Sequence, residues 1–566
     1  MNNNIVYENA AQRKTYVGEV YDQGEHKVKE DVLNNLPEEW ARLHRDGHIH
    51  IHDLDAYGLT YNCLTFDLLK GFPYSSFEGL SNSRKVLRLF EFYKSLVSKV
   101  GNEQSGGMGF GNFDLDTATL LKNLGVPEDE TCLGLIRDSI AEFLQWCNDS
   151  HERMGQVSYY VTLNIGLADS DLSRYICRAV IEEFATLPPT VYKPNIVFKV
   201  KDKVNHGEQD PNHDLFLLAL SCTAKKMIPT YLLCDCEADR TFDPRDLSIM
   251  GCRTRVVSDL FGATGSRGRG NIDNISINLP RLAMEVDEEL PEATVDLRVD
   301  LFKKKWTAVA DTVTEILLDR YRKTLERSVE LFPTVHKYNL WIEDFGNAET
   351  MAENLKHGTL SFGFIGLSEA IEVLTGKKYY MGSEEYSEAL DFVKYMRTYA
   401  NKCIEKYHLN FSLLATSGEL ISGRFCEIDK TLYSNKITEK GFYTNSFHID
   451  VDSCIPAFEK ISKEGPFHTI CNGGCITYVE LGESPIGNVE GLSEYVDCAI
   501  KSGTHYLGFN FPLDICRGCG NKGVFDSCPE CGSQEITRIR RVSGYLEILD
   551  YFVSGKKHEV SHRRKN

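Results

Sequence analysis

Four cysteines near the C-terminal end of the chain are spaced to bind a metal ion. The stretch CRGCGNKGVFDSCPECG places Cys516, Cys519, Cys528 and Cys531 in two C-x2-C pairs separated by eight residues. Each pair can form a tight turn whose thiolates converge, and the neighbouring glycines suit such turns. Four thiolates complete a tetrahedral coordination sphere, so the spacing predicts a structural zinc site. An iron–sulfur cluster is the alternative that the same ligands allow.

Gly544 interrupts a strand-like run shortly after these cysteines. It lies in the middle of RVSGYLEIL, residues 541–549. Glycine weakens a strand and usually marks a bulge, a bend or the close approach of another backbone. The residues alone leave these three alternatives open.

Two further motifs contain residue types that bind metals or phosphates. HIHIHD places His48, His50 and His52 at strand alternation ahead of Asp53, so one face could hold a transition metal. GATGSRGRGN, residues 262–271, is rich in glycine but has the spacing of neither a P-loop nor a dinucleotide-binding loop. We interpret the first as a weak metal candidate and the second as a surface loop.

The charge of the chain limits its partners. Lys and Arg number 63 against 82 Asp and Glu, which gives a net charge of −19. Nucleic acids and anionic membranes attract an excess of basic residues, so neither is an expected partner. No signal peptide or long apolar run is visible, so we expect a cytoplasmic protein whose cysteines are reduced.

Helical and strand-like segments alternate along most of the chain. Apolar residues recur at helical spacing in 83–101, 133–149, 299–326 and 383–407, and short apolar runs occupy 160–167, 195–200, 230–236, 275–280 and 411–416. This alternation predicts an α/β fold with buried, mainly parallel strands. The end of the chain is instead rich in Cys, Gly and basic residues. We therefore predict a large domain over 1–510 and a small C-terminal domain over 511–566.

A series of motifs, in order along the chain, carries a family resemblance. They are GHIHIHDLD, YNCLTFDL, MGCRT, SFGFIGLSEA, GFYTNSFHI, FEKISKEGPFH, GGCITYVEL, the four-cysteine module, RVSGYL and GKKHEV. Together they resemble the catalytic subunit of anaerobic, or class III, ribonucleoside-triphosphate reductases, which are glycyl radical enzymes. The resemblance implies a ten-stranded α/β barrel and the reduction of ribonucleoside triphosphates to deoxyribonucleoside triphosphates for DNA synthesis.

The resemblance also assigns roles to three residues. Gly544 matches the glycine that stores an unpaired electron, and Cys252 in MGCRT matches the cysteine that becomes a transient thiyl radical. Cys63 in YNCLTFDL matches the second active-site cysteine, which donates hydrogen as the 2′-hydroxyl leaves as water. Cys252 and Cys63 are 189 residues apart, so the fold must bring them together.

Substrate-binding positions follow from the same resemblance. Asn271 falls at the family's active-site asparagine, whose amide would bind substrate hydroxyls or formate. Thr416, Ser417 and Gly418 fall where the family places a helix N-terminus against the substrate phosphates. The better-known members read Pro-Ala at the last two of these positions.

Cofactors and partners are implied in the same way. A separate radical-SAM activase, with S-adenosylmethionine and a 4Fe-4S cluster, would generate the glycyl radical. Effectors would be dNTPs and ATP, and the chain would form a homodimer. Many members use formate as the reductant. The better-known members tend to carry histidine where this chain has Cys475, so either formate or a thioredoxin-like dithiol protein could be the reductant here.

Only 47 residues precede HIHIHD, too few for the N-terminal ATP-cone of many members, so we expect no dATP inhibition through a cone. Two other functions remain as alternatives. The first is another glycyl radical enzyme, of the formate acetyltransferase or dehydratase type, because RVSGY is shared across that superfamily. The second is a zinc-ribbon adaptor or nucleic-acid-binding protein, which the acidic charge disfavours.

Overall fold

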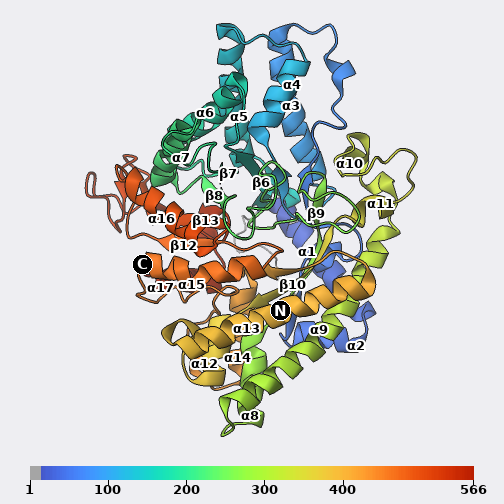
Figure 1. Ribbon diagram of the computed structural model, residues 1–566, viewed down its shortest axis with the longest axis vertical. Coiled ribbons are helices and arrows are strands. Elements are labelled where there is room, and N and C mark those ends of the chain that lie inside the picture. Colours follow the sequence, from blue (N-terminus) through green and yellow to red (C-terminus); the bar gives the residue numbers. More distant parts are fainter. Residues whose placement is uncertain (1–14) are drawn as a thin grey trace.

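Five parallel strands form one half of a central barrel (Figure 1). The computed structural model describes residues 15–566, apart from the side chains of residues 152 and 153. Because parallel neighbours need crossover connections, helices lie between these strands along the chain. The strands are β2 (Cys63–Phe66), β3 (Met108–Phe110), β6 (Val161–Ile165), β7 (Asn195–Val200) and β8 (Thr230–Leu233), and the helices are α3 (Asn82–Val100), α4 (Phe113–Asn123), α5 (Glu130–Asp149), α6 (Asp171–Thr186) and α7 (His213–Lys226).

The second half of the barrel runs antiparallel to the first. It consists of β9 (Arg269–Asn278), β10 (Thr359–Ile365), β11 (Phe411–Ala415), β12 (Thr477–Glu480) and β13 (Tyr506–Asn510). β9 pairs with β2 and β13 pairs with β8, both antiparallel. The wall closes where the Ala415 N–H donates to the Gly474 carbonyl, just ahead of β12. The ten-stranded α/β barrel expected from the sequence is thereby confirmed.

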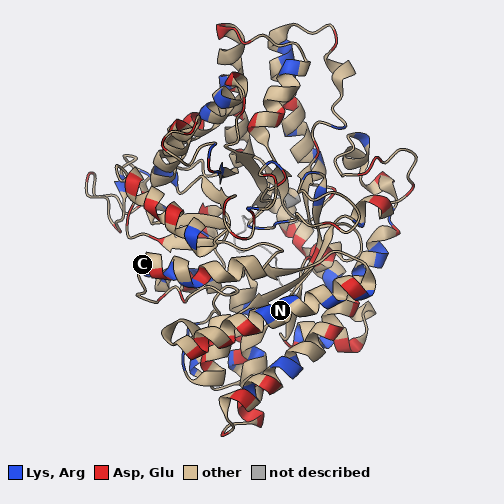
Figure 2. Ribbon diagram, viewed as in Figure 1, with Lys and Arg blue, Asp and Glu red and all other residues tan. Residues whose placement is uncertain are grey.

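Long helices cover the outside of the barrel. Two of the predicted helices are α3 and α5, and the other two are α9 (Val295–Leu325) and α13 (Ser383–Tyr407). Figure 2 shows charged residues of both signs spread over these outer helices. The other helices of more than five residues are α1 (Tyr16–Asn35), α2 (Glu38–Arg45), α8 (Leu279–Glu289), α12 (Leu367–Thr375), α14 (Ile421–Leu432), α15 (Ala457–Ile470), α16 (Val489–Ser502) and α17 (Ser554–His562).

Residues 234–268 connect β8 to β9 and pack against the strands of the first half. The Asn164 side chain on β6 bonds both backbone groups of Ile249, and the Thr162 hydroxyl donates to the Gly251 carbonyl at 3.3 Å. The Gly268 N–H donates to the carbonyl of Thr65 on β2. These bonds fix the turn that carries Cys252.

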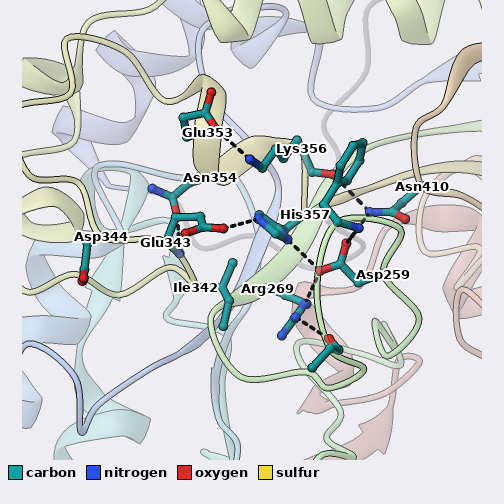
Figure 3. A network of polar contacts seen from close by, with 12 residues as sticks. Asp259, Arg269, Ile342, Glu343, Asp344, Glu353, Asn354, Lys356, His357 and Asn410 are labelled. Atoms are coloured by element: carbon teal, nitrogen blue, oxygen red, sulfur yellow. Dashed lines mark hydrogen bonds and ion pairs between the residues drawn. The ribbon is translucent and has the colours of Figure 1, made fainter.

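A buried polar network holds the returning end of this loop (Figure 3). Asp259 accepts from Arg269 at 2.9 Å and contacts the His357 ring at 2.6 Å. Burial alone would raise the pKa of Asp259, but the hydrogen bonds from His357 and Arg269 lower it below its usual value. The surface-loop interpretation of residues 262–271 holds only for 262–264, which are exposed. Residues 265–271 are buried except for the partly buried Arg267, and β9 begins at Arg269.

The C-terminal residues form a separate antiparallel sheet of four strands. Its order is β15 (Lys522–Gly523), β14 (Leu513–Cys516), β16 (Ile536–Arg541) and β17 (Leu546–Ile548). The hairpin between β16 and β17 points toward the barrel and carries Gly544. Helix α17 then packs against α14, where the Gly555 and Gly423 backbones touch. Within the described part of the chain, no helix is long and apolar enough to cross a membrane.

Candidate active site

Gly544 touches the backbone of Cys252. Val542 to Tyr545 form the tip of the β16–β17 hairpin, closed by a bond from the Val542 N–H to the Tyr545 carbonyl. A Cβ placed on Gly544 would lie 2.0 Å from the Cys252 carbonyl oxygen and 2.3 Å from its Cα. The sequence left open a bulge, a bend or the close approach of another backbone. The structure shows the third, and this close approach is the reason that glycine is required at position 544.

The Cys252 thiol lies beside polar groups of the hairpin and of the segment just ahead of α14. It donates to a Glu419 carboxylate oxygen at 3.3 Å, and the Ser543 hydroxyl lies 3.5 Å from the sulfur. The Tyr545 hydroxyl donates to the other Glu419 oxygen at 2.7 Å. One carboxylate thus contacts both loops that meet at this point.

Cys63 reaches the same place from the barrel wall. It is the first residue of β2, and its sulfur accepts from the Gly107 N–H at 3.1 Å. Its thiol donates to the Asn62 side-chain carbonyl at 2.7 Å. Cys63 and Cys252 line one cavity, so the fold does bring together the two thiols selected from the sequence.

Both thiols remain protonated at neutral pH. Burial raises the pKa of Cys63 to about 12, and burial followed by the Glu419 charge raises the pKa of Cys252 further. A thiol that keeps its hydrogen can donate a hydrogen atom, whereas a thiolate cannot. The site therefore suits hydrogen-atom transfer rather than nucleophilic attack, which requires a thiolate.

One wall of the cavity has the features expected for a phosphorylated substrate. The cavity volume is about 130 Å³, smaller than the roughly 300–1,000 Å³ typical of small-molecule sites. Thr416, Ser417 and Gly418 line it, followed by the N-terminus of α14, which no side chain caps. Backbone N–H groups at such a terminus attract anions. Gly418 has a φ of +54°, and a Cβ there would lie 2.0 Å from the Asn445 side chain, so this chain needs glycine at that position.

Asn271 does not meet the expectation that its amide faces the substrate. It pairs with Cys63 across β9 and β2, but it is not among the residues that line the cavity. Its buried amide donates to Thr359 at 3.0 Å and to the Ser361 hydroxyl at 2.9 Å on β10. Asn62 and Asn274 are the cavity-lining amides instead. The register of β9 against β10 shifts next to Asn271. As a result Asn274 lines the cavity, whereas Asn271 does not.

Glu419 and Tyr545 are site residues that the motif analysis did not select. Each directly follows a selected residue, Gly418 or Gly544. Adjacency to a selected residue is the signal that the sequence offers for them. It does not show whether their side chains point toward the site, because the direction of a side chain depends on the local backbone.

The four C-terminal cysteines fit a zinc ion. Their sulfurs all lie within 4.8 Å of one another, with Cys516–Cys531 and Cys519–Cys528 separations of 3.5 Å. A tetrahedral Zn–S₄ site has S–S distances of about 3.8 Å. Each pair closes a turn whose last residue, Gly520 or Gly532, has a positive φ. The donor set and turns are therefore those of a structural site.

Other histidine and cysteine clusters do not match a metal site as well. His48 contacts Glu285 and His52 contacts Ser276. These two histidines of HIHIHD therefore bond to different residues and do not converge on one metal site. His468, Cys475 and His505 lie within metal-binding distance of one another. However, Nδ1 of His468 accepts from the His505 N–H and its Nε2 contacts Thr477, which leaves His468 no free lone pair.

Comparisons with known proteins agree with this geometry. The family model described as anaerobic ribonucleoside-triphosphate reductase matches residues 8–565. The anaerobic ribonucleoside-triphosphate reductase of Escherichia coli is 28% identical, over 94% of this chain and 79% of its own. That of Enterobacteria phage T4 is 28% identical, over 95% of this chain and 93% of its own. The anaerobic ribonucleotide reductase from Thermotoga maritima, solved with dATP and CTP, has a TM-score of 0.70 at 15% identity, covering 96% of this chain and 90% of that one.

Gly544→Ala is expected to expel the hairpin tip, because its Cβ cannot occupy the space of the Cys252 carbonyl. We expect a loss of about 1–3 kcal/mol in the free energy of unfolding and faster proteolysis near residue 544. Gly134→Ala, in α5 with open space around its Cα, is the control and should be neutral or stabilising. Denaturant unfolding and limited proteolysis check both, and an unchanged hairpin in Gly544→Ala would contradict the contact.

Elemental analysis of the purified chain should find about one zinc per chain and no iron–sulfur absorption. Cys519→Ser should lower the zinc content and loosen β14–β16, because one ligand of four is lost. Cys454→Ser, at an exposed cysteine outside the module, is the control. A second stoichiometric metal in the wild-type chain would contradict our interpretation of the histidine clusters.

Proposed function

The chain belongs to the anaerobic ribonucleoside-triphosphate reductase family, and on that premise we propose how its own residues perform the reduction of ribonucleoside to deoxyribonucleoside triphosphates. The observation that carries the proposal is the contact of Gly544 with Cys252 at a cavity that also contains Cys63. A glycine, two protonated thiols and an anion-binding helix terminus are the parts that such a reaction needs. The formate acetyltransferase or dehydratase alternative is not favoured by the family match.

Gly544 would store the unpaired electron between turnovers. Removal of a hydrogen atom from its Cα leaves a radical shared between the donor amide nitrogen and the acceptor carbonyl. The hydrogen atom would go to a carbon radical that a radical-SAM activase makes from S-adenosylmethionine. Burial of the hairpin tip supports this role, because it shields the radical from solvent species and oxygen.

Cys252 and Cys63 would act on the ribose in sequence. Gly544 takes a hydrogen atom from the Cys252 thiol, and the sulfur radical then takes the 3′-hydrogen of the substrate. Cys63 donates a hydrogen atom to the sugar as the 2′-hydroxyl leaves as water. Formate would restore this hydrogen to Cys63 and supply the second electron as it is oxidised to CO₂. Cys252 would then return hydrogen to C3′, which regenerates its sulfur radical. The raised thiol pKa values support both steps, because each begins with an intact S–H bond.

The substrate phosphates would lie on the N-terminus of α14, against Thr416, Ser417 and Gly418. The ribose would then sit between this wall and the two thiols. Glu419 is placed to accept a hydrogen bond from a ribose hydroxyl, since its oxygen is 3.3 Å from the Cys252 sulfur. We propose CTP as a substrate and dATP as an effector by analogy with the Thermotoga maritima complex.

We propose formate as the reductant. Among the described residues, the cysteines that line the cavity are Cys63 and Cys252. Cys471 and Cys475 are buried in the main hydrophobic core and do not line it. A dithiol relay through Cys475 would therefore need a route that the cavity does not provide.

Three further points belong to the proposal. A radical-SAM activase acts on the chain, the chain forms a homodimer, and residues 511–566 form one domain that binds zinc and carries the radical. The module supports the last point, because β14 supplies Cys516 and pairs with β16, the strand that leads to Gly544. Zinc at the four cysteines would hold this sheet in shape.

Anaerobic activation with a radical-SAM activase, followed by EPR and a CTP reduction assay, tests the proposal. We expect a glycyl doublet and dCTP formation in the wild type. Cys252→Ala and Cys63→Ala should keep the doublet and lose dCTP formation by at least about a thousandfold, because each removes an obligatory hydrogen donor. Absence of the doublet in the wild type, or dCTP formation by Cys252→Ala, would refute it.

Formate alone should support turnover, and Cys475→Ala should retain it, because that thiol lies outside the cavity. Parallel assays supply formate or a thioredoxin system to the wild type and to Cys475→Ala. Cys471→Ala is the matched control for loss of a buried thiol. Turnover with the dithiol protein only, lost in Cys475→Ala, would reverse the assignment.

A further inference from the structure

Arg541 is directed at the radical glycine. It is the last residue of β16, its side chain is 1% exposed, and its Nη1 donates to the Gly544 carbonyl oxygen at 3.3 Å. Its other donors reach the Asn510 side-chain oxygen at 2.6 Å and the Met227 carbonyl at 2.5 Å. The guanidinium is thus held rigidly behind the hairpin tip.

The charge of Arg541 has no ion-pair partner within 4 Å in the described part of the chain. Some other buried arginines do have one, as Arg281 pairs with Asp429 and Arg320 with Asp273. The acceptors around Arg541 are neutral carbonyl and amide oxygens, and the Tyr478 ring lies 5.9 Å away. Burial of an unpaired charge is unfavourable for folding, so its retention here points to a functional reason.

We propose that Arg541 stabilises the unpaired electron on Gly544 by placing positive charge at its carbonyl oxygen. This inference rests on the proposed function, in which Gly544 carries the radical. In the delocalised radical the amide nitrogen gives up electron density and the carbonyl oxygen gains it. A guanidinium that donates to that oxygen therefore stabilises the radical more than the parent glycine.

Arg541 remains protonated throughout. When the activase acts, the Gly544 Cα–H bond breaks and one hydrogen atom leaves. When the Cys252 thiol reacts, its S–H bond breaks and a Cα–H bond forms, so the electron vacancy moves to sulfur. By stabilising only the glycyl side of this exchange, Arg541 holds the electron on Gly544 between turnovers. It is a positioning residue, because it acts through Gly544 and not on the substrate.

EPR of the activated full-length chain tests this role with three variants. Arg541→Met removes the charge, Arg541→Lys retains it on a shorter side chain, and Arg540→Met is the control because Arg540 pairs with Asp514 at 2.7 Å. We expect Arg541→Met to lower the doublet yield by roughly tenfold, the worth of one charge-assisted hydrogen bond. Its α-hydrogen splitting should increase, because more spin remains on Cα. Arg541→Lys should be intermediate and Arg540→Met unchanged.

A measurement on the wild type avoids dependence on variant folding. With arginine labelled by ¹⁵N in the guanidinium, pulsed EPR should detect a ¹⁵N coupling to the glycyl radical, which Arg541→Lys removes and Arg540→Met keeps. A wild-type doublet without this coupling, or a folded Arg541→Met with unchanged splitting and yield, would overturn the role of Arg541 and leave the proposed function standing. No wild-type doublet at all would overturn both.

Discussion

The contact between Gly544 and the backbone of Cys252 is the constraint on which the rest of the structure depends. Two loops of distant origin meet there, and no Cβ fits between them. The proposed exchange of a hydrogen atom between Gly544 and Cys252 requires both loops to be held in place, because such a transfer occurs only between groups in near contact. The barrel, the polar anchors and the C-terminal sheet can each be understood as supports for this one distance.

Each support acts on one of the two loops. Asn164 and Thr162 hold the turn with Cys252 against β6, and the Asp259–Arg269 pair holds the loop's returning end. On the other side, β16 is paired with β14, whose last residue belongs to the four-cysteine module. None of the four cysteines of the module lines the cavity, which agrees with a structural rather than a chemical role for the zinc that they are proposed to bind.

Burial has opposite consequences for the different groups of the site. It keeps the two cavity thiols protonated, as hydrogen donors must be. Burial also makes a charge without an ion-pair partner unfavourable for folding, which is why the buried guanidinium of Arg541 suggests a functional role. Cys475 is also buried, yet it lies outside the cavity among His468 and His505. Position relative to the cavity, and not residue type, distinguishes the thiols that we propose to react from the other buried cysteines.

The sequence by itself determined the features that depend on local spacing. These are the long helices such as α9, the buried strands such as β7, and the four-cysteine module with its glycine turns. The motif resemblance predicted the barrel fold and the presence of Cys63 and Cys252 in one active site. Only the tertiary structure decided three outcomes. The Asn271 amide donates to residues of β10, the Glu419 carboxylate contacts both the Cys252 thiol and the β16–β17 hairpin, and Cys475 does not line the cavity. Those outcomes depend on which strands become neighbours and which way side chains point across them, and residues far apart in sequence do not encode that locally.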